Sequence, residues 1–138
     1  MTVVGYAPGA YDMFHIGHLN ILRRASEHCD RLVAGVVGDD VVLRAKGKLP
    51  IVPFEERIEI VRSVRYVDEA VPDPHVDKFA AWEALRFDVL FKGDDWRGTE
   101  RGKLLEARLG EVGAKVIYFP YTMHTSSSAL RKLISIPS

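Results

Sequence analysis

Apolar residues along this chain fall into two patterns that alternate from one end to the other. Short apolar runs occur within residues 3–6, 32–38, 65–71, 88–92 and 114–119. Such runs are typical of buried strands. Between them, apolar residues recur at three- and four-residue steps, as at Leu19, Leu22 and Ala25, which is the spacing of an amphipathic helix. We therefore expect an α/β fold in a single domain over 1–138, with five mostly parallel strands and helices on both faces.

The helical spacing continues in the second half of the chain and predicts which side chains face the core. Phe79, Trp82 and Leu85 share one helix face, which indicates core packing rather than a platform for base stacking. The triplet Pro72-Asp73-Pro74 is expected to end the third strand. The further helices that we expect cover 41–43 after a cap at Asp39 or Asp40, 54–64, 76–87, a segment through 104–109 capped by Thr99, and 129–134.

Composition narrows the classes of protein that this fold could serve. The 138 residues suffice for one domain with a core, and Lys+Arg and Asp+Glu are both 19, so the formal net charge is zero. A protein that binds long nucleic acid would have a net basic surface. The single cysteine, Cys29, excludes an internal disulfide. No apolar run approaches the ~18 residues of a membrane span, and no signal-peptide pattern is present. A cytoplasmic enzyme without membrane insertion fits this composition, as do many other classes of protein.

The stretch most indicative of chemistry holds two histidines, His15 and His18, with Gly17 between them. It lies where the first strand gives way to the first helix, and the free amides of a helix start favour an anion. Gly17 would let a phosphate approach the backbone, and two imidazoles could donate hydrogen bonds to its oxygens. A lone histidine at such a place is more often a cap or a half-buried surface residue, but the pair with its glycine favours a phosphate site.

The segment His15-Ile16-Gly17-His18 resembles the HxGH motif of the nucleotidyltransferase superfamily. The wider sequence, from about Val3 to about Ile134, resembles the small cytidylyltransferases and in particular the glycerol-3-phosphate cytidylyltransferases. The resemblance implies a Rossmann-like, doubly wound sheet in the order 3-2-1-4-5, with the site between the first and fourth strands. It also implies transfer of CMP from CTP to a phosphorylated alcohol, glycerol 3-phosphate first among them, with Mg²⁺ on the triphosphate and a homodimer.

A basic segment, 44–53, follows the second strand and reads as a loop because it holds a glycine and two prolines. It is either a solvated basic loop or a mobile clamp that lays ammonium groups on a triphosphate. Lys46 and Lys48 match the paired lysines of the glycerol-3-phosphate enzymes, allowing a one-residue insertion just after them. The resemblance therefore implies that both bind the triphosphate, Lys46 as a catalytic residue.

Two arginines stand in a segment that resembles the E-x-R … R-Y-V-D-E-V pattern of the same family. Arg57 is expected to face away from the apolar stripe of its helix, and Arg65 follows that helix. The resemblance makes both candidates for acceptor binding, at the site or at a dimer interface near Arg65-Tyr66. An arginine fork suits phosphate because it donates two hydrogen bonds at once. For Arg57 the alternative is a surface helix charge.

The fourth strand ends in Gly93-Asp94-Asp95-Trp96, which matches the G-D-D-W element of the glycerol-3-phosphate enzymes residue for residue. An isolated Asp-Asp is usually a turn or a cap, whereas open parallel sheets bind ligands at this edge. Asp94 and Asp95 are candidates for nucleotide, acceptor hydroxyls or a magnesium ion, and Asp94 is the one residue we name for the metal. Trp96 is a candidate wall for the base or the acceptor.

The segment 121–128 resembles the R-T-x-G-I-S-T-T motif, with Thr122, Ser126 and Ser127 on its hydroxyl positions. These hydroxyls either cap the last helix or bind phosphate beside its amides. Tyr121 stands where the family has arginine and His124 where it has glycine. His124, Arg131 or a lysine of the basic segment would have to replace the missing guanidinium.

By this resemblance His15 and His18 donate hydrogen bonds in the transition state, and Asp12 orients a histidine or the nucleotide. The related alternatives use ATP with a sugar phosphate or a flavin, or CTP with phosphoethanolamine or a phosphonate. A non-catalytic nucleotide-binding module is a more distant alternative. An aminoacyl-tRNA synthetase is not expected from so short a chain without a K-M-S-K-S-like stretch. The remaining residues expected at the nucleotide are Gly9, Ala10, Tyr11 and Gly17.

Overall fold

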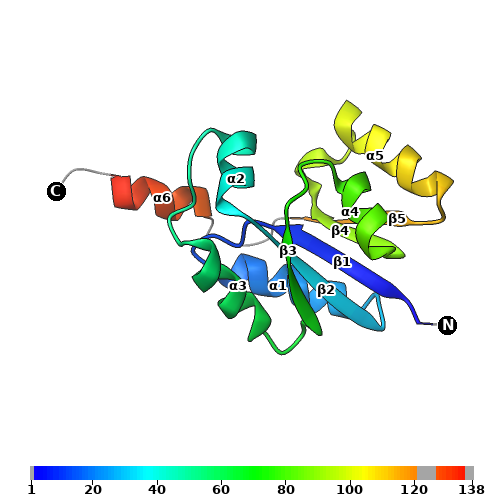
Figure 1. The fold of residues 1–138 in the computed structure, drawn as a ribbon, viewed down its shortest axis with the longest axis horizontal. Coiled ribbons are helices and arrows are strands. Elements are labelled where there is room, and N and C mark those ends of the chain that lie inside the picture. Colours follow the sequence, from blue (N-terminus) through cyan, green and yellow to red (C-terminus); the bar gives the residue numbers. More distant parts are fainter. Residues whose placement is uncertain (1, 121–126, 136–138) are drawn as a thin grey trace.

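A five-stranded sheet forms the centre of the molecule in the computed structural model, which describes residues 2–120 and 127–135 (Figure 1). The strands lie in the order β3-β2-β1-β4-β5, and every neighbouring pair is parallel. The predicted α/β fold and its strand order are confirmed. The strands are β1 (Val4–Gly9), β2 (Arg31–Val37), β3 (Glu69–Asp73), β4 (Val89–Gly93) and β5 (Lys115–Phe119).

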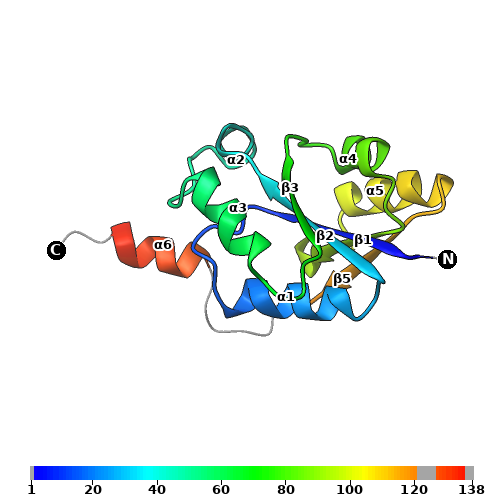
Figure 2. The same cartoon turned by 60° about the horizontal axis from the view of Figure 1, so that its bottom comes forward.

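Helices cover both faces of this sheet. Figure 2 shows α1 on one side of the strands and α4 and α5 on the other. Because all strands are parallel, each connection returns the chain across a face, which is what places the helices there. The helical elements are α1 (Ile16–Ser26), α2 (Asp39–Lys46), α3 (Phe54–Arg62), α4 (Lys78–Leu85), the 3₁₀ turn η1 (Asp94–Trp96), α5 (Glu100–Glu111) and α6 (Ser127–Ser135).

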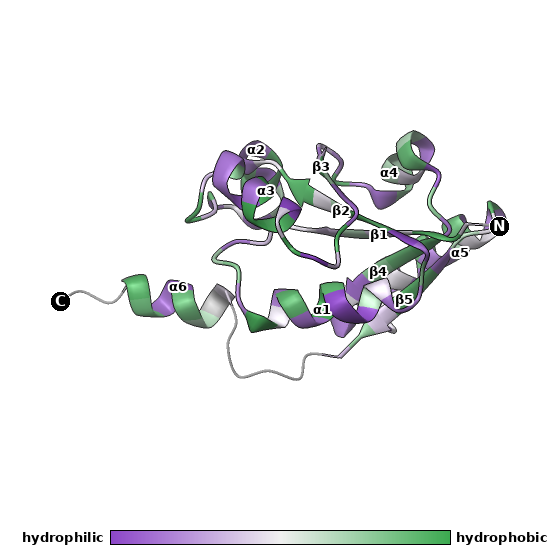
Figure 3. Ribbon diagram, turned by 90° about the horizontal axis from the view of Figure 1, so that it is seen from below, coloured by the Kyte–Doolittle hydropathy of each residue, from purple (hydrophilic) through white to green (hydrophobic). Residues whose placement is uncertain are grey.

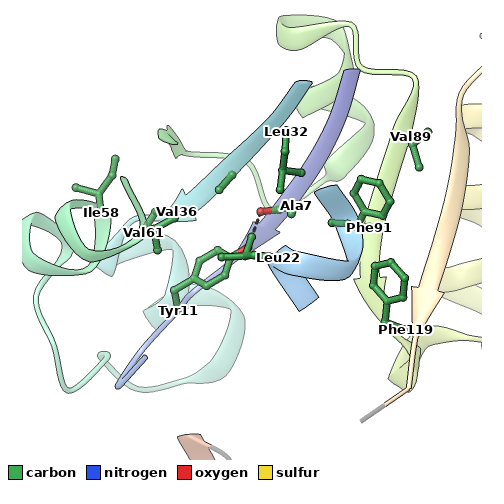
Figure 4. Close-up of a cluster of buried hydrophobic side chains, with 12 residues drawn as sticks. Ala7, Tyr11, Leu22, Leu32, Val36, Ile58, Val61, Val89, Phe91 and Phe119 are labelled. Carbon is green, nitrogen blue, oxygen red and sulfur yellow. Dashed lines mark hydrogen bonds between the residues drawn. The ribbon is translucent and has the colours of Figure 1, made fainter. Parts of the chain in front are cut away.

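The strands are buried on both faces, so the core consists of two clusters separated by the sheet. One cluster joins α1 and α3 to the sheet and includes Leu22, Val61 and Phe91 (Figure 4). The other joins α4 and α5 to the sheet and includes Tyr6 and Leu90. Neighbouring residues of one strand point to opposite faces. Leu90 belongs to the α4–α5 cluster and Phe91 to the α1–α3 cluster. The face to which each later residue of β4 points follows from this alternation.

Two expected boundaries are wrong in a way that matters for the site. β3 continues through Pro72 to Asp73 and does not break there, because β3 is an edge strand and an edge tolerates a missing amide. α2 continues to Lys46 and ends at Gly47, whose φ of 76° is left-handed, so the basic loop begins after Lys46. Asp39 lies in the first turn of α2 instead of capping it, since the cap is Gly38.

Other local expectations are confirmed. The Thr99 hydroxyl accepts a hydrogen bond from the Gly102 amide and caps α5. Phe79, Trp82 and Leu85 pack against the α4–α5 cluster, as their spacing indicates. None of the helices in the described part of the chain is long and apolar enough to cross a bilayer.

α6 extends away from the sheet, and Figure 3 shows apolar positions along it. Leu133 and Ile134 are 67% and 59% exposed. Ser127 and Arg131 join α6 to the rest of the molecule through contacts described below. These residues of α6 therefore lie at the edge where the site lies.

Candidate active site

The site is built on the loop that joins β1 to α1 at the carboxyl edge of the sheet. Tyr11 and Met13 have φ values of 54° and 50°, a left-handed conformation that bulky residues rarely adopt and that clusters at functional sites. The Tyr11 hydroxyl donates a hydrogen bond to the Ala7 carbonyl at 2.8 Å, deep in the core (Figure 4). Its ring packs beside Phe14 and His18. The expectation that Tyr11 binds the nucleotide is wrong for its side chain, which is 7% exposed and supports the loop from beneath.

His15 and His18 lie together at the start of α1. Their ring centroids are 4.1 Å apart. His15 is the N-cap and its Nδ1 accepts a hydrogen bond from the Gly17 amide at 3.0 Å, while Nδ1 of His18 accepts one from the His15 amide at 3.2 Å. A neutral imidazole that accepts at Nδ1 carries its proton at Nε2. This reciprocal cap therefore fixes both tautomers with the proton on Nε2, and no described residue accepts a hydrogen bond from either Nε2–H.

The surroundings keep both rings neutral. Burial, then the neighbouring His15 and then Lys46 lower the pKa of His18 to about 4, although Asp12 acts in the opposite direction. Burial also lowers the pKa of His15. At neutral pH the pair therefore donates hydrogen bonds without carrying charge, which suits a group that stabilises charge developing on phosphate oxygens.

Gly17 contributes differently from its expected role. It is buried, and its amide is already bound to His15 Nδ1. That amide is therefore not free for a phosphate in this structure. Gly9 ends β1, and Ala10 opens the loop with its carbonyl bound to Arg57, so both lie at the expected edge.

Asp12 is 6% exposed and joins three segments that are distant in sequence. Its carboxylate accepts hydrogen bonds from the Ile51 and Val52 amides, each at 2.8 Å, and from Arg131 at 3.1 Å. Its backbone carbonyl accepts one from the Ser127 hydroxyl at 2.6 Å. Asp12 therefore ties the basic segment and α6 to the histidine loop, and our expectation that it orients a histidine or the nucleotide stays a prediction.

Arg57 is 1% exposed, so the alternative of a surface helix charge is wrong, while its role in acceptor binding stays a prediction. Its guanidinium donates to the carbonyls of Ala10, Val37 and Val52 at 2.6 to 2.8 Å and pairs with Asp39. These partners belong to the ends of β1 and β2 and to the segments beside α2 and α3. The arginine is thus a buried tie between the loops of the carboxyl edge, with no donor directed at a ligand.

Arg65 is exposed and lies against the ring of Tyr66. It precedes β3, so it belongs to the amino edge of the parallel sheet, opposite the histidine loop. Within one chain it does not reach the site, and its role at a dimer interface stays a prediction.

Cationic groups approach the histidines from two further elements. Lys46 ends α2 and lies close enough to lower the pKa of both His18 and Lys92. Lys48 follows Gly47 and is exposed. Lys92, near the end of β4, was missed by the sequence reasoning. The signal that could have found it is a lysine that interrupts an apolar strand directly before Gly93-Asp94-Asp95-Trp96.

The turn after β4 is compact. Asp94, Asp95 and Trp96 form η1, and the Trp96 ring contacts the Lys92 ammonium at 4.0 Å and the Arg101 guanidinium at 4.4 Å from its centroid. The indole therefore packs against cations here, and its role as a wall for the base or the acceptor stays a prediction. Asp94 and Asp95 are at the carboxyl edge, as expected.

A magnesium ion would need oxygen ligands from its substrate. Within residues 2–120 and 127–135 no group of three or more His, Cys, Asp or Glu side chains is arranged to hold a metal. Asp94 and Asp95 supply at most two carboxylates, fewer than an all-protein site requires. The donor set fits an ion carried by a triphosphate, with these carboxylates beside it.

Some expected residues fall elsewhere. Thr122 and Ser126, like Tyr121 and His124, lie outside the described residues. Ser127 begins α6, as expected for the motif, but its hydroxyl is bound to Asp12. A cavity of about 440 Å³ opens at the same sheet edge, beside the ends of β2 and β3, and it is lined by Gly38, Asp39, Asp40, Phe54, Pro72, Asp73 and Pro74.

A parallel sheet with two imidazoles at the start of its first helix is the arrangement of the HxGH nucleotidyltransferases. The chain belongs to the cytidylyltransferase-like family, which it matches over residues 6–133. It is 35% identical over 136 residues to an FAD synthase of Pyrococcus abyssi, covering 96% of this chain and 88% of that protein. It is 38% identical over 95 residues to an ethanolamine-phosphate cytidylyltransferase of Arabidopsis thaliana, covering 65% of this chain but 22% of the relative.

Solved structures agree on the fold. A lipopolysaccharide core biosynthesis protein from Thermoplasma volcanium superimposes with a TM-score of 0.73 at 22% identity, covering 91% of this chain and all of the other. A pantoate-beta-alanine ligase from Francisella tularensis gives 0.70 at 13% identity over 94% of this chain and 65% of the ligase. At such identities the likeness concerns the fold alone.

Proposed function

We propose that this protein transfers a nucleoside monophosphate from CTP to a phosphorylated alcohol, with glycerol 3-phosphate as the first candidate. The observation that carries the reaction type is the pair of Nε2–H donors, fixed by the reciprocal cap of His15 and His18, beside the ammonium of Lys46. Such an arrangement binds and stabilises an α-phosphoryl group and needs no protein nucleophile.

In this reaction an acceptor phosphate oxygen attacks the α-phosphorus in line. The new P–O bond forms as the bond from the α-phosphorus to the bridging oxygen breaks, and pyrophosphate leaves with that electron pair. The acceptor oxygen is already anionic, so no base is required. His15 and His18 donate to the oxygens on which charge builds, and Lys46 and Lys48 hold the triphosphate. Mg²⁺, when bound to the triphosphate, neutralises part of its charge.

The preference for CTP and a small phospho-alcohol rests on two lines of support. One is the match of Gly93-Asp94-Asp95-Trp96 and of the Arg65 segment to the glycerol-3-phosphate enzymes. The other is the likeness to a cytidylyltransferase that acts on ethanolamine phosphate. The cavity beside β2 and β3, with the apolar walls of Phe54 and Pro72 and the carboxylates of Asp39 and Asp40, offers room for the organic part of an acceptor.

A second candidate is adenylyl transfer from ATP to FMN. It is favoured by one specific observation, that FAD synthases such as the Pyrococcus abyssi protein align with 96% of this chain. The chemistry and the groups that perform it would be the same, and the base and acceptor would differ.

A panel of substrates tests both candidates. CTP and ATP are each combined with glycerol 3-phosphate, phosphoethanolamine, FMN and sugar 1-phosphates, and pyrophosphate release is measured together with the nucleotide product. The proposal expects stoichiometric pyrophosphate and a CDP-alcohol with CTP, while FAD formation from ATP would select the second candidate. Binding of CTP or ATP without pyrophosphate from any pair would indicate a non-catalytic module and overturn the proposal.

A further inference from the structure

The carboxyl edge holds two half-buried lysines with different surroundings, Lys78 and Lys92. The Lys78 ammonium pairs with the Asp73 carboxylate at 3.0 Å and donates to the His75 carbonyl at 2.7 Å. For Lys92, no carboxylate in the described part of the chain lies within the 4.0 Å of an ion pair, and its ammonium lies over the Trp96 ring, 4.0 Å from the centroid. Desolvating an ammonium is costly unless an anion accompanies it. Among the described residues Lys92 therefore has no ion-pair partner within 4.0 Å, and Asp95 acts on it only from a greater distance.

The position of Lys92 gives the direction from which an anion would come. Leu90 belongs to the cluster under α4 and α5, whereas Phe91 belongs to the cluster under α1. Since alternate residues share a face, Lys92 points to the same face as Leu90. The histidines stand at the start of α1, which packs on the opposite face. Lys92 and the histidine pair thus approach the carboxyl edge from opposite sides of the sheet.

Other cations lie near Lys92. Arg101 contacts the same indole as Lys92. Burial lowers the pKa of the Lys92 ammonium, and Lys78, Arg101 and Lys46 lower it further, although Asp95 opposes them. Lys46 acts in the same way on His18. The charge of Lys46 at the end of α2 therefore acts on both groups.

We propose that Lys92 binds the phosphate of the acceptor. In-line transfer places the attacking oxygen and the leaving pyrophosphate on opposite sides of the α-phosphorus. The histidine side holds the triphosphate, Lys46 lies at the centre, and Lys92 on the other face holds the acceptor phosphate that attacks. The substrate class is thus a phosphomonoester, whichever alcohol it carries. This inference rests on the proposed function and assigns to it a residue that the sequence reasoning did not name.

The experiment uses inorganic phosphate as the probe and steady-state kinetics as the second readout. Phosphate is titrated calorimetrically into the full chain, both free and saturated with a non-hydrolysable CTP or ATP analogue that blocks the triphosphate side. The variants are Lys92→Met, Lys92→Arg and, as the control, Lys115→Met, an exposed lysine at the amino edge. Affinity for the analogue is measured for each variant.

In the analogue-filled protein we expect Lys92→Met to weaken phosphate binding at least tenfold and to raise the acceptor KM by a similar factor. Its affinity for the analogue stays within twofold, Lys92→Arg recovers much of the phosphate affinity, and Lys115→Met matches the wild type. Unchanged phosphate binding in Lys92→Met overturns the inference, as does an equal loss of affinity for the analogue. If no analogue binds and no pyrophosphate is released, the proposed function fails. The titration of the free protein then decides whether Lys92 is an anion site, and unchanged binding there overturns the inference too.

Discussion

Three polar side chains lie wholly or partly buried at the same edge of the sheet: Arg57, His18 and Lys92. They differ in whether hydrogen-bond and ion-pair partners within the chain bind their polar atoms. Every nitrogen of the Arg57 guanidinium is bound within the chain, to three carbonyls and to Asp39. His18 accepts at Nδ1, which leaves its proton on Nε2 without a hydrogen-bond acceptor among the described residues, and Lys92 lies over an indole. Saturated polar groups hold the loops in place, and unsaturated ones bind substrate.

The largest expected effect is a loss of stability on replacing Arg57, whose guanidinium is fully hydrogen-bonded within the chain. Arg57→Met would leave the Asp39 carboxylate and three carbonyls without their donor, so we expect a loss of about 3–5 kcal/mol in the free energy of unfolding. Urea unfolding followed by circular dichroism measures it. Arg62→Met, on the same helix but exposed and paired with Glu59, is the control and should change stability by less than about 0.5 kcal/mol. Equal losses in the two variants would contradict the comparison.

Replacing His18 should lower the rate of turnover and leave stability nearly unchanged. In His18→Asn the amide oxygen can still accept from the His15 amide and keep the cap, but the Nε2–H donor is gone. We expect turnover to fall about 100- to 1,000-fold, the usual effect of removing one such donor. Pyrophosphate release at saturating substrates measures it, and an unfolding midpoint close to that of the wild type serves as the control. Near-normal release would remove His18 from the chemistry.

The neutral state of His18 predicts a pH dependence of stability. Because the pKa of His18 is lowered from 6.5 to about 4, the unfolded chain binds a proton between these values that the folded protein does not. The free energy of unfolding should therefore fall as the pH drops from about 6.5 to about 4, by at most about 3 kcal/mol from this residue. Unfolding curves across this window should be flatter for His18→Asn. Identical slopes in the two proteins would show that His18 titrates normally.

The smallest effect is expected at Arg65. Its guanidinium is exposed, is not bound to buried partners as that of Arg57 is, and does not point to the site. Arg65→Ala removes a contact with Tyr66 on an exposed surface, so the free energy of unfolding should change by less than about 0.5 kcal/mol. The acceptor KM should stay within twofold, because Lys92 and not Arg65 binds the acceptor phosphate. A tenfold rise in that KM, with a dimer in sedimentation, would restore Arg65 to the site through a second copy.

Sequence reasoning captured what local pattern determines. The packing face of Phe79 and Trp82 follows from periodicity, and the pairing of the histidines follows from one short motif. The strand order came from the family resemblance. Sequence reasoning missed what distant residues decide. Arg57 can be buried because carbonyls 20 and 47 residues away accept hydrogen bonds from its guanidinium. The spacing of residues along its own helix does not reveal these partners.

The same limit applies to two residues of the site. Asp12 looked like a partner for the histidines because they are near it in sequence, but its carboxylate is bound by amides 39 and 40 residues later. In the sequence, Lys92 is the last residue of an expected strand, which is not by itself a sign of a role. The cations that act on it belong to three other elements, α2, α4 and α5. Residues whose role is set by contacts across the sheet edge therefore need the structure.

The central claim is that both imidazoles accept at Nδ1 and donate from Nε2. Long-range ¹H–¹⁵N NMR of the histidine rings at pH 7 measures this directly, because protonated and bare ring nitrogens differ strongly in chemical shift. We predict that His15 and His18 are both neutral with the proton on Nε2, and that these two Nε2 signals move when CTP or ATP is added. Protonated Nδ1 positions, charged rings, or Nε2 signals that do not respond to either nucleotide would contradict the account.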